Sequence, residues 1–165
     1  MSNCCYCCIK ALSVILQKLH SLDISVQITS NGTENAVPSS GGVSTQVTPS
    51  LVIFKNTIIP LCNIEDIRFV EADKDKIAQI IKALEATKDD ECCGDKLRKL
   101  IEPGGNIGKI TSTTHENLIN ASPKPIIATG LGAVLLSEGA SGLTKNKYHL
   151  VALCQISALE YIKKQ

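Results

Sequence analysis

The chemistry that this sequence offers is mainly that of thiols, because eight of its 165 residues are cysteines. Such a density is typical of disulfide-bonded proteins or of metal sites. Two adjacent pairs stand at the N-terminus, a third pair stands near the middle, and two cysteines are isolated: Cys4-Cys5, Cys7-Cys8, Cys92-Cys93, Cys62 and Cys154. The arrangement admits both covalent cross-linking and metal binding.

A metal site would use the C-x-x-C spacing that the N-terminal run contains twice. Four thiolates are enough for a tetrahedral zinc site, and iron–sulfur clusters use the same ligands. A doubled C-C-x-C-C run differs, however, from the tight knuckles of zinc ribbons. A zinc- or iron-binding regulatory module with Cys4, Cys7, Cys92 and Cys93 as ligands is therefore kept as the alternative.

Disulfide bonds fit the N-terminal run better. A bridge needs Cα atoms about 4.4–6.8 Å apart, so adjacent cysteines rarely bond to each other and each pair is expected to face two partners. Chain ends are mobile and accessible, so an N-terminal arm can carry its thiols to a neighbouring copy. The candidates for intermolecular cross-links are Cys4, Cys5, Cys7, Cys8, Cys92 and Cys93.

The two isolated cysteines, Cys62 and Cys154, lie in similar aliphatic, strand-like surroundings. An unpaired cysteine behaves as a small apolar residue and is usually buried. Both are predicted to be buried thiols. In the alternative interpretation, each bonds to the cysteine pair of its own half.

The sequence shows no catalytic arrangement. His20, His115 and His149 are scattered, without the spacing of a metallohydrolase helix. The glycine-rich stretch 104–108 lacks the lysine of a phosphate-binding loop, and we interpret it as a helix stop. We expect no enzymatic activity and no cofactor.

Composition argues against several kinds of partner. Lysine and arginine number 17 and aspartate and glutamate 16, so the chain lacks the basic surface of a nucleic-acid-binding protein. Aromatic residues make up 3%, too few for base-stacking platforms. The apolar stretch Ile9–Leu19 is too short to cross a bilayer and has no basic segment before it, so we expect cytoplasmic synthesis without a signal peptide and no membrane insertion.

Four segments of the first half recur in the same order in the second half. The last pair shares the pattern Leu-Cys-x-Ile-x-x-aliphatic-x-aromatic. The matches are Cys7-Cys8 with Cys92-Cys93, Leu16–Leu19 with Leu97–Leu100, Val26–Ser30 with Gly108–Ser112, and Leu61–Phe69 with Leu153–Tyr161. This order predicts two degenerate copies of one small unit.

Periodicity predicts a helix followed by about five short strands in each half. Helices are expected at 9–20, Asp73–Thr87 with Asp73 as N-cap, and Cys93–Ile101. Strands are expected at Ile24–Thr29, Leu51–Phe54, Thr57–Leu61, Ile64–Val70, Asn106–Ser112, Asn117–Ala121, Ile126–Thr129, Ala133–Ser137 and Tyr148–Ile162, with a loop or two short edge strands at 33–50.

The predicted fold class is α+β, mainly β, with two similar helix-plus-small-β-barrel or sandwich units in tandem. The order of elements is that of an Sm-like or SH3-like barrel, a likeness of fold that says little about function. The expected organisation is a cysteine-rich arm at 1–8, a β unit at 9–71, a connecting helix and linker at 72–91, and a second β unit at 92–165.

The stretch Ile58–Ile64 and the leading cysteine run resemble cysteine-bearing structural proteins of spore-forming Firmicutes, assigned to spore coat, exosporium or spore appendages. In the second half Val151-Ala152 replaces Ile59-Pro60, a departure from the pattern. The resemblance implies self-assembly, disulfide cross-linking after the mother cell lyses, and a final place on the spore or cell surface.

These observations predict a homopolymer, a fibre or layer in which copies of the chain bind one another. Near-zero net charge supports this, because net charge is what keeps copies apart. The alternatives are the metal-binding module and an Sm-like nucleic-acid-binding protein, of which charge and aromatic content disfavour the latter.

Overall fold

The computed structural model describes residues 3–89, 99–119, 123–140 and 146–163, with the side chains of residues 3–7, 89, 139 and 140 excepted. In the first half the elements are α1 (Asn3–Ser21), β1 (Val26–Ser30), β2 (Val37–Gly42), β3 (Gln46–Val47), β4 (Leu51–Phe54), β5 (Thr57–Pro60), the 3-10 turn η1 (Leu61–Asn63) and β6 (Ile64–Glu71). Then follow α2 (Lys74–Glu85), η2 (Ala86–Asp89), β7 (Asn106–Ser112), β8 (Lys124–Gly130), β9 (Ala133–Ala140), β10 (Asn146–Ala152), η3 (Leu153–Gln155) and β11 (Ile156–Ile162).

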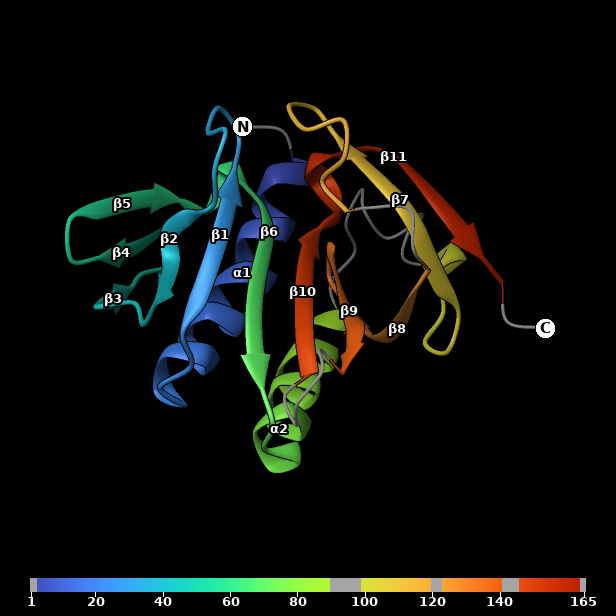
Figure 1. The fold of residues 1–165 in the computed structure, drawn as a ribbon, viewed down its shortest axis with the longest axis horizontal. Coiled ribbons are helices and arrows are strands. Elements are labelled where there is room, and N and C mark those ends of the chain that lie inside the picture. Colours follow the sequence, from blue (N-terminus) through green and yellow to red (C-terminus); the bar gives the residue numbers. More distant parts are fainter. Residues whose placement is uncertain (1–2, 90–98, 120–122, 141–145, 164–165) are drawn as a thin grey trace.

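The predicted mainly β, α+β class is confirmed. A large antiparallel sheet has the strand order β11-β7-β8-β9-β10-β6-β1-β2, and a small sheet has the order β3-β4-β5. The two sheets meet where β2 leads through residues 43–45 into β3 (Figure 1). The large sheet contains strands from both halves, because β6 of the first half pairs with β10 of the second.

The first helix positions the cysteine run. Its buried apolar positions follow a helical period and are Cys8, Ala11, Leu12, Ile15, Leu16 and Leu19. Figure 1 shows α1 behind β1 and β6, where this stripe faces the main core. Residues 3–8 thus continue the helix predicted at 9–20, whereas a separate arm was expected at 1–8. Cys8 extends the apolar stripe of this helix by one position before residue 9.

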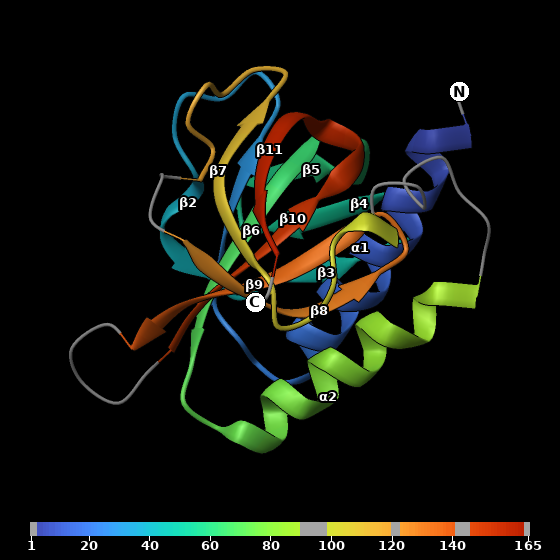
Figure 2. The same cartoon turned by 90° about the vertical axis from the view of Figure 1, so that its right-hand side faces the viewer.

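The second helix covers the sheet from the same side, beneath β8 (Figure 2). The predicted cap is confirmed, since the Asp73 side chain accepts hydrogen bonds from the backbone N–H groups of Asp75 and Lys76. Ile77, Ile80 and Leu84 form its buried stripe. None of the helices in the described residues is both long and apolar enough to cross a membrane.

The second half encloses a small core of its own. Strand β9 is buried on both faces, so Ala133 and Leu135 join the main core while Val134 and Leu136 join the small one. The other members of the small core come from β7, β8, β10, η3 and the neighbouring turns: Ile101, Ile107, Ile110, Ile119, Ile126, Val151 and Leu153. The strands β11-β7-β8-β9-β10 surround these aliphatic side chains.

Two predicted strands in this half differ from the structure. The strand expected at Tyr148–Ile162 is two strands, because η3 interrupts it at Leu153–Gln155 and buries Leu153. In the described part of the segment 117–121, the strand is reduced to a single bridge between Ile119 and Ile110. The helix expected at Cys93–Ile101 lies mostly outside the described residues.

Segments that match between the halves have matching local structure. Leu61–Asn63 and Leu153–Gln155 are both 3-10 turns, each of which buries its leucine. Each turn lies between the last two strands of its half, β5 and β6 or β10 and β11. Val26–Ser30 and Gly108–Ser112 belong to the first strand of each half.

Candidate assembly site

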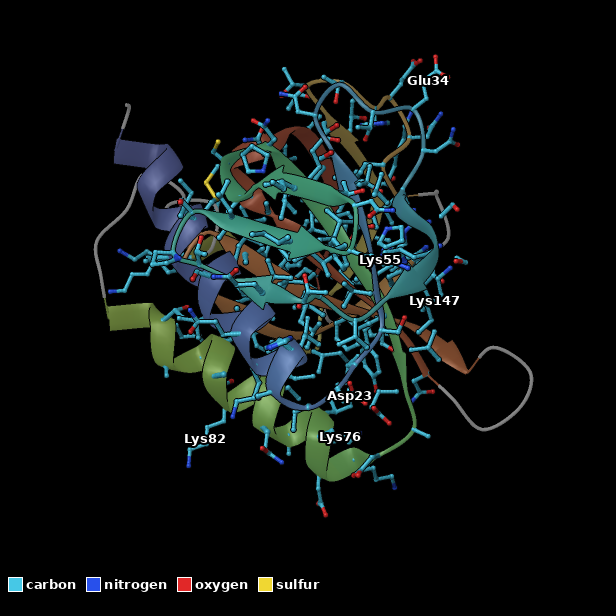
Figure 3. All side chains as sticks on the ribbon, turned by 90° about the vertical axis from the view of Figure 1, so that its left-hand side faces the viewer. Asp23, Glu34, Lys55, Lys76, Lys82 and Lys147 are labelled. Carbon is cyan, nitrogen blue, oxygen red and sulfur yellow. A yellow bond between two sulfur atoms is a disulfide. The ribbon has the colours of Figure 1, made fainter. Side chains whose placement is uncertain are left out.

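The one disulfide among the described side chains joins the two halves. Cys8, in the second turn of α1, is bonded to Cys154 in η3, 146 residues further along the chain, with a Cα separation of 6.3 Å. Cys8 is buried and Cys154 half-buried. The bond, drawn in yellow in Figure 3, fixes the N-terminal helix to the turn before the last strand.

A glycine makes room for this bond. Gly132, in the turn between β8 and β9, has a φ of +67°, which favours glycine, and a Cβ built there would lie 2.9 Å from the Cys8 sulfur. Its carbonyl oxygen accepts a hydrogen bond of 2.8 Å from the N–H of Leu153. The turn therefore holds η3 in place and leaves the space that Cys8 occupies.

These contacts correct three expectations about cysteines. Cys8 is bonded within its own chain rather than to a neighbour, and Cys154 is bonded rather than a buried thiol. The reason is tertiary: α1 brings Cys8 to η3 of the opposite half. Cys62 is an unbonded cysteine in η1, but it is half-buried rather than buried.

The side chains of Cys4, Cys5, Cys7, Cys92 and Cys93 lie outside the described residues. The structure therefore tests neither the predicted cross-links at these positions nor the alternative metal site of Cys4, Cys7, Cys92 and Cys93. Within the described side chains, no group of three or more histidines, cysteines or carboxylates is placed to hold a metal ion.

The halves meet along β6 and β10. These strands form an antiparallel ladder of six residue pairs: Asn146 with Glu71, Lys147 with Val70, Tyr148 with Phe69, His149 with Arg68, Leu150 with Ile67, and Val151 with Asp66. The rings of Phe69 and Tyr148 stack with centroids 5.3 Å apart. Leu150 and Ile67 are fully buried. The contact is thus both a backbone ladder and part of the core.

A buried ionic cluster lies across the same ladder. His149 Nδ1 is 2.9 Å from an Asp66 oxygen, and His149 Nε2 is 2.8 Å from a Glu138 oxygen. His149 and Asp66 are only 4% and 1% exposed. Lys147 pairs with Glu138 at 2.9 Å, and the Arg68 guanidinium lies 3.6 Å from Asp66.

Burial by itself would lower the pKa of His149, because it disfavours the charged imidazolium. The carboxylates of Asp66 and Glu138 outweigh burial and raise the pKa of His149 above its ordinary value. For Glu138, burial acts to raise the pKa, but Lys147 and His149 lower it overall. The cluster therefore favours a protonated histidine between two carboxylates.

A second buried carboxylate links loops from the two halves. Glu65, fully buried at the start of β6, contacts His115 Nδ1 and accepts a 2.6 Å hydrogen bond from the Thr114 hydroxyl. His115 Nε2 lies 2.8 Å from the Thr33 carbonyl oxygen in the β1–β2 turn. Nearby, the Gln155 amide donates a 2.6 Å hydrogen bond to the Cys62 carbonyl. These contacts hold the halves in one relative position.

Sequence reasoning did not find these buried ionic residues. One signal was present: Glu65-Asp66 interrupts a strand that is otherwise mainly apolar, and a buried charge requires a partner. The partners, His115 and His149, lie 50 and 83 residues away, so their identity depends on the fold.

Four strands lie at ends of the sheets, β2 and β11 in the large sheet and β3 and β5 in the small one, and each has one neighbouring strand within the described residues. Ile58 of β5 is 62% exposed. Beside β11 lies an open groove of 650 Å³ whose apolar lining includes Leu100, Ile156, Leu159 and Tyr161. The molecule thus carries an exposed apolar residue on one edge strand and an apolar groove beside another.

Comparison with known proteins identifies no relative: no family model, no curated protein and no solved structure matches this chain.

Proposed function

We propose that this protein is a self-assembling structural protein that forms a fibre or layer, with copies cross-linked by disulfide bonds. One observation carries the proposal. Within a single chain, the two halves are already joined by strand pairing between β6 and β10 and by the Cys8–Cys154 bond. A polymer needs the same two kinds of contact between chains.

We further propose that each half is an Sm-like or SH3-like barrel unit. In support, the second half has the strand order β11-β7-β8-β9-β10, in which its last strand pairs with its first. In the first half, likewise, β6 pairs with β1. Both halves have a 3-10 turn before the last strand. Each chain would then supply two successive units of a larger array.

Cross-linking in this proposal is ordinary thiol oxidation. Two cysteine thiols of different copies lose two protons and two electrons and form one sulfur–sulfur bond, while dioxygen accepts them and becomes hydrogen peroxide. The candidate thiols are Cys4, Cys5, Cys7, Cys92 and Cys93. Because cytosolic proteins are kept reduced, cross-linking would follow release from the cell. The resemblance of the cysteine run and of Ile58–Ile64 to spore-coat proteins suggests the spore surface as its destination.

The test is assembly of the full chain under oxidising and reducing conditions, followed by electron microscopy and non-reducing electrophoresis. The wild type is expected to form regular assemblies and a ladder of covalent oligomers in oxidant. Replacing Cys4, Cys5, Cys7, Cys92 and Cys93 together with serine should abolish the ladder and leave the circular dichroism spectrum unchanged.

A matched control separates cross-linking from folding. The double variant Cys8→Ser/Cys154→Ser removes the internal bond and should lose about 2–4 kcal/mol of stability. It should still form the series of covalent oligomers on the non-reducing gel. A monodisperse wild-type monomer in oxidant would overturn the proposal of self-assembly. If the five-cysteine variant still forms the same covalent oligomers, these five cysteines are not the cross-linking residues.

A further inference from the structure

We propose that copies associate head to tail by antiparallel pairing of β5 of one chain with β11 of the next. This rests on the proposed function and names the surface and the partner, a second copy. The contact would repeat between chains the β6–β10 ladder that joins the halves within one chain.

The repeat identifies which strands correspond. Leu61 of η1 matches Leu153 of η3, 92 positions later, and Ile64 matches Ile156 at the same offset. Strand β5 precedes η1 as β10 precedes η3, and β6 follows η1 as β11 follows η3. Strands β10 and β6 pair with each other inside the chain. Their counterparts, β5 and β11, both lie at sheet ends, as do β2 and β3, which are joined to each other through residues 43–45.

The same offset supplies the register. The internal pair Leu150 with Ile67 becomes Ile58 with Leu159 of the next copy. The pair Val151 with Asp66 becomes Ile59 with Ala158, and His149 with Arg68 becomes Thr57 with Glu160. The register therefore sets the exposed Ile58 opposite Leu159, which lines the apolar groove.

A proline in β5 is compatible with this register. Proline has no N–H to donate to a ladder and is found at strand edges. The counterpart of Pro60 is Ala152, which lies beyond the β10 residues that pair with β6. The missing N–H of Pro60 thus falls outside the proposed ladder.

The contact is expected to be weaker than the internal one. Strand β5 supplies three residue pairs, Thr57 to Ile59, where β10 supplies six. The internal ladder also carries the buried ion pair between His149 and Asp66. The counterparts of these residues, Thr57 and Ala158, cannot form an ion pair. A reversible edge contact that disulfides later lock agrees with this difference.

The contact is heterologous, because two different surfaces of the chain bind each other. It yields a closed ring if the rotation relating successive copies divides a full turn evenly, and an open filament otherwise. Edge strands with exposed backbone are templates for such addition. The tip of the β4–β5 hairpin, marked by Lys55 in Figure 3, would lie beside β11 of the neighbour.

The test measures association by sedimentation velocity in reductant, where disulfides cannot contribute. Ile58→Glu places a charge in the apolar contact and should weaken association at least tenfold. The matched control is Val70→Glu, since Val70 is also an exposed apolar residue, at 45%, but lies on β6, whose partners are already in place. Equal association of the two variants would overturn the proposal.

A charge exchange tests the register. Thr57→Glu should weaken association because it faces Glu160 of the next copy, and Thr57→Glu/Glu160→Lys should restore it. A double variant as weak as Thr57→Glu would overturn the register. A wild type that is monomeric in reductant at every concentration would overturn the edge contact, whereas covalent assemblies in oxidant would still support the proposed function.

Discussion

His149 links charged groups of the two halves, as His115 does through Glu65. His149 lies on β10 of the second half and touches Asp66 on β6 of the first half and Glu138 on β9. The other charged groups around the cluster are Arg68, Lys124 and Lys147. A protonated imidazole is balanced by carboxylates on both of its nitrogens, so its titration is linked to the joint between the halves.

The raised pKa of His149 predicts a pH dependence of stability. The folded state holds the imidazole proton more tightly than the unfolded state, whose histidine pKa is about 6.5. This stabilisation is fully present below that pH and is lost as the pH rises through the raised folded value.

The measurement is the free energy of unfolding by urea at pH 6 and pH 9. The wild type should lose stability over this range, and His149→Gln should lack that slope. His20→Gln is the control, because His20 is exposed and contacts the Ser44 hydroxyl rather than a carboxylate. An equal slope in the wild type and His149→Gln would contradict the prediction.

At the scale of elements, the end of α2 is fixed to the β8–β9 turn through Thr87. Its hydroxyl donates a 2.6 Å hydrogen bond to the Leu84 carbonyl and accepts a 2.8 Å hydrogen bond from the Leu131 N–H. Gly130 permits this approach, because a Cβ there would overlap Leu84 and Thr87. The β8–β9 turn thus contacts the end of α2 next to Gly130 and leaves space for Cys8 at Gly132.

Thr87→Val should therefore destabilise the protein by about 1–3 kcal/mol, since the buried Leu131 N–H loses its acceptor while the shape of the side chain is kept. Thr87→Ser keeps the hydroxyl and should recover most of that loss. Chemical denaturation followed by circular dichroism measures both. A serine variant no more stable than the valine variant would show that the hydroxyl is not the stabilising group.

For the whole molecule, the main core crosses the boundary between the halves. It includes Leu12 and Leu16 of α1, Ile67 of β6, and Leu135 and Leu150 from the second half. The disulfide, the β6–β10 ladder and the two buried carboxylates cross the same boundary. Neither half could open without exposing apolar surface of the other.

We expect the chain to unfold in one cooperative transition, despite its two similar halves. Scanning calorimetry should give a ratio of calorimetric to van't Hoff enthalpy near one. Two separate transitions, or a ratio well above one, would contradict this and show that the halves are stable independently.

Local patterns in the sequence were enough for most elements. The 3.6-residue stripe and the Asp73 cap predict α2, and the alternating or apolar runs predict the strands. The matched Leu-Cys-x-Ile segments correctly indicate two places of like structure, at η1 and η3. The single strand predicted at Tyr148–Ile162 was inconsistent with this match, because the equivalent stretch of the first half was predicted as two strands. In both halves a 3-10 turn separates the two strands.

Only the tertiary structure decided how the halves are joined. Which cysteine meets Cys8, and which histidine meets Asp66, depends on contacts across 146 and 83 residues. Local propensity acts over a few residues and carries no information about such distances. The sequence by itself therefore determined the elements and their likeness. Packing of α1 and pairing of β6 with β10 decided the disulfide, the ionic cluster and the position of β5 and β11 at sheet ends.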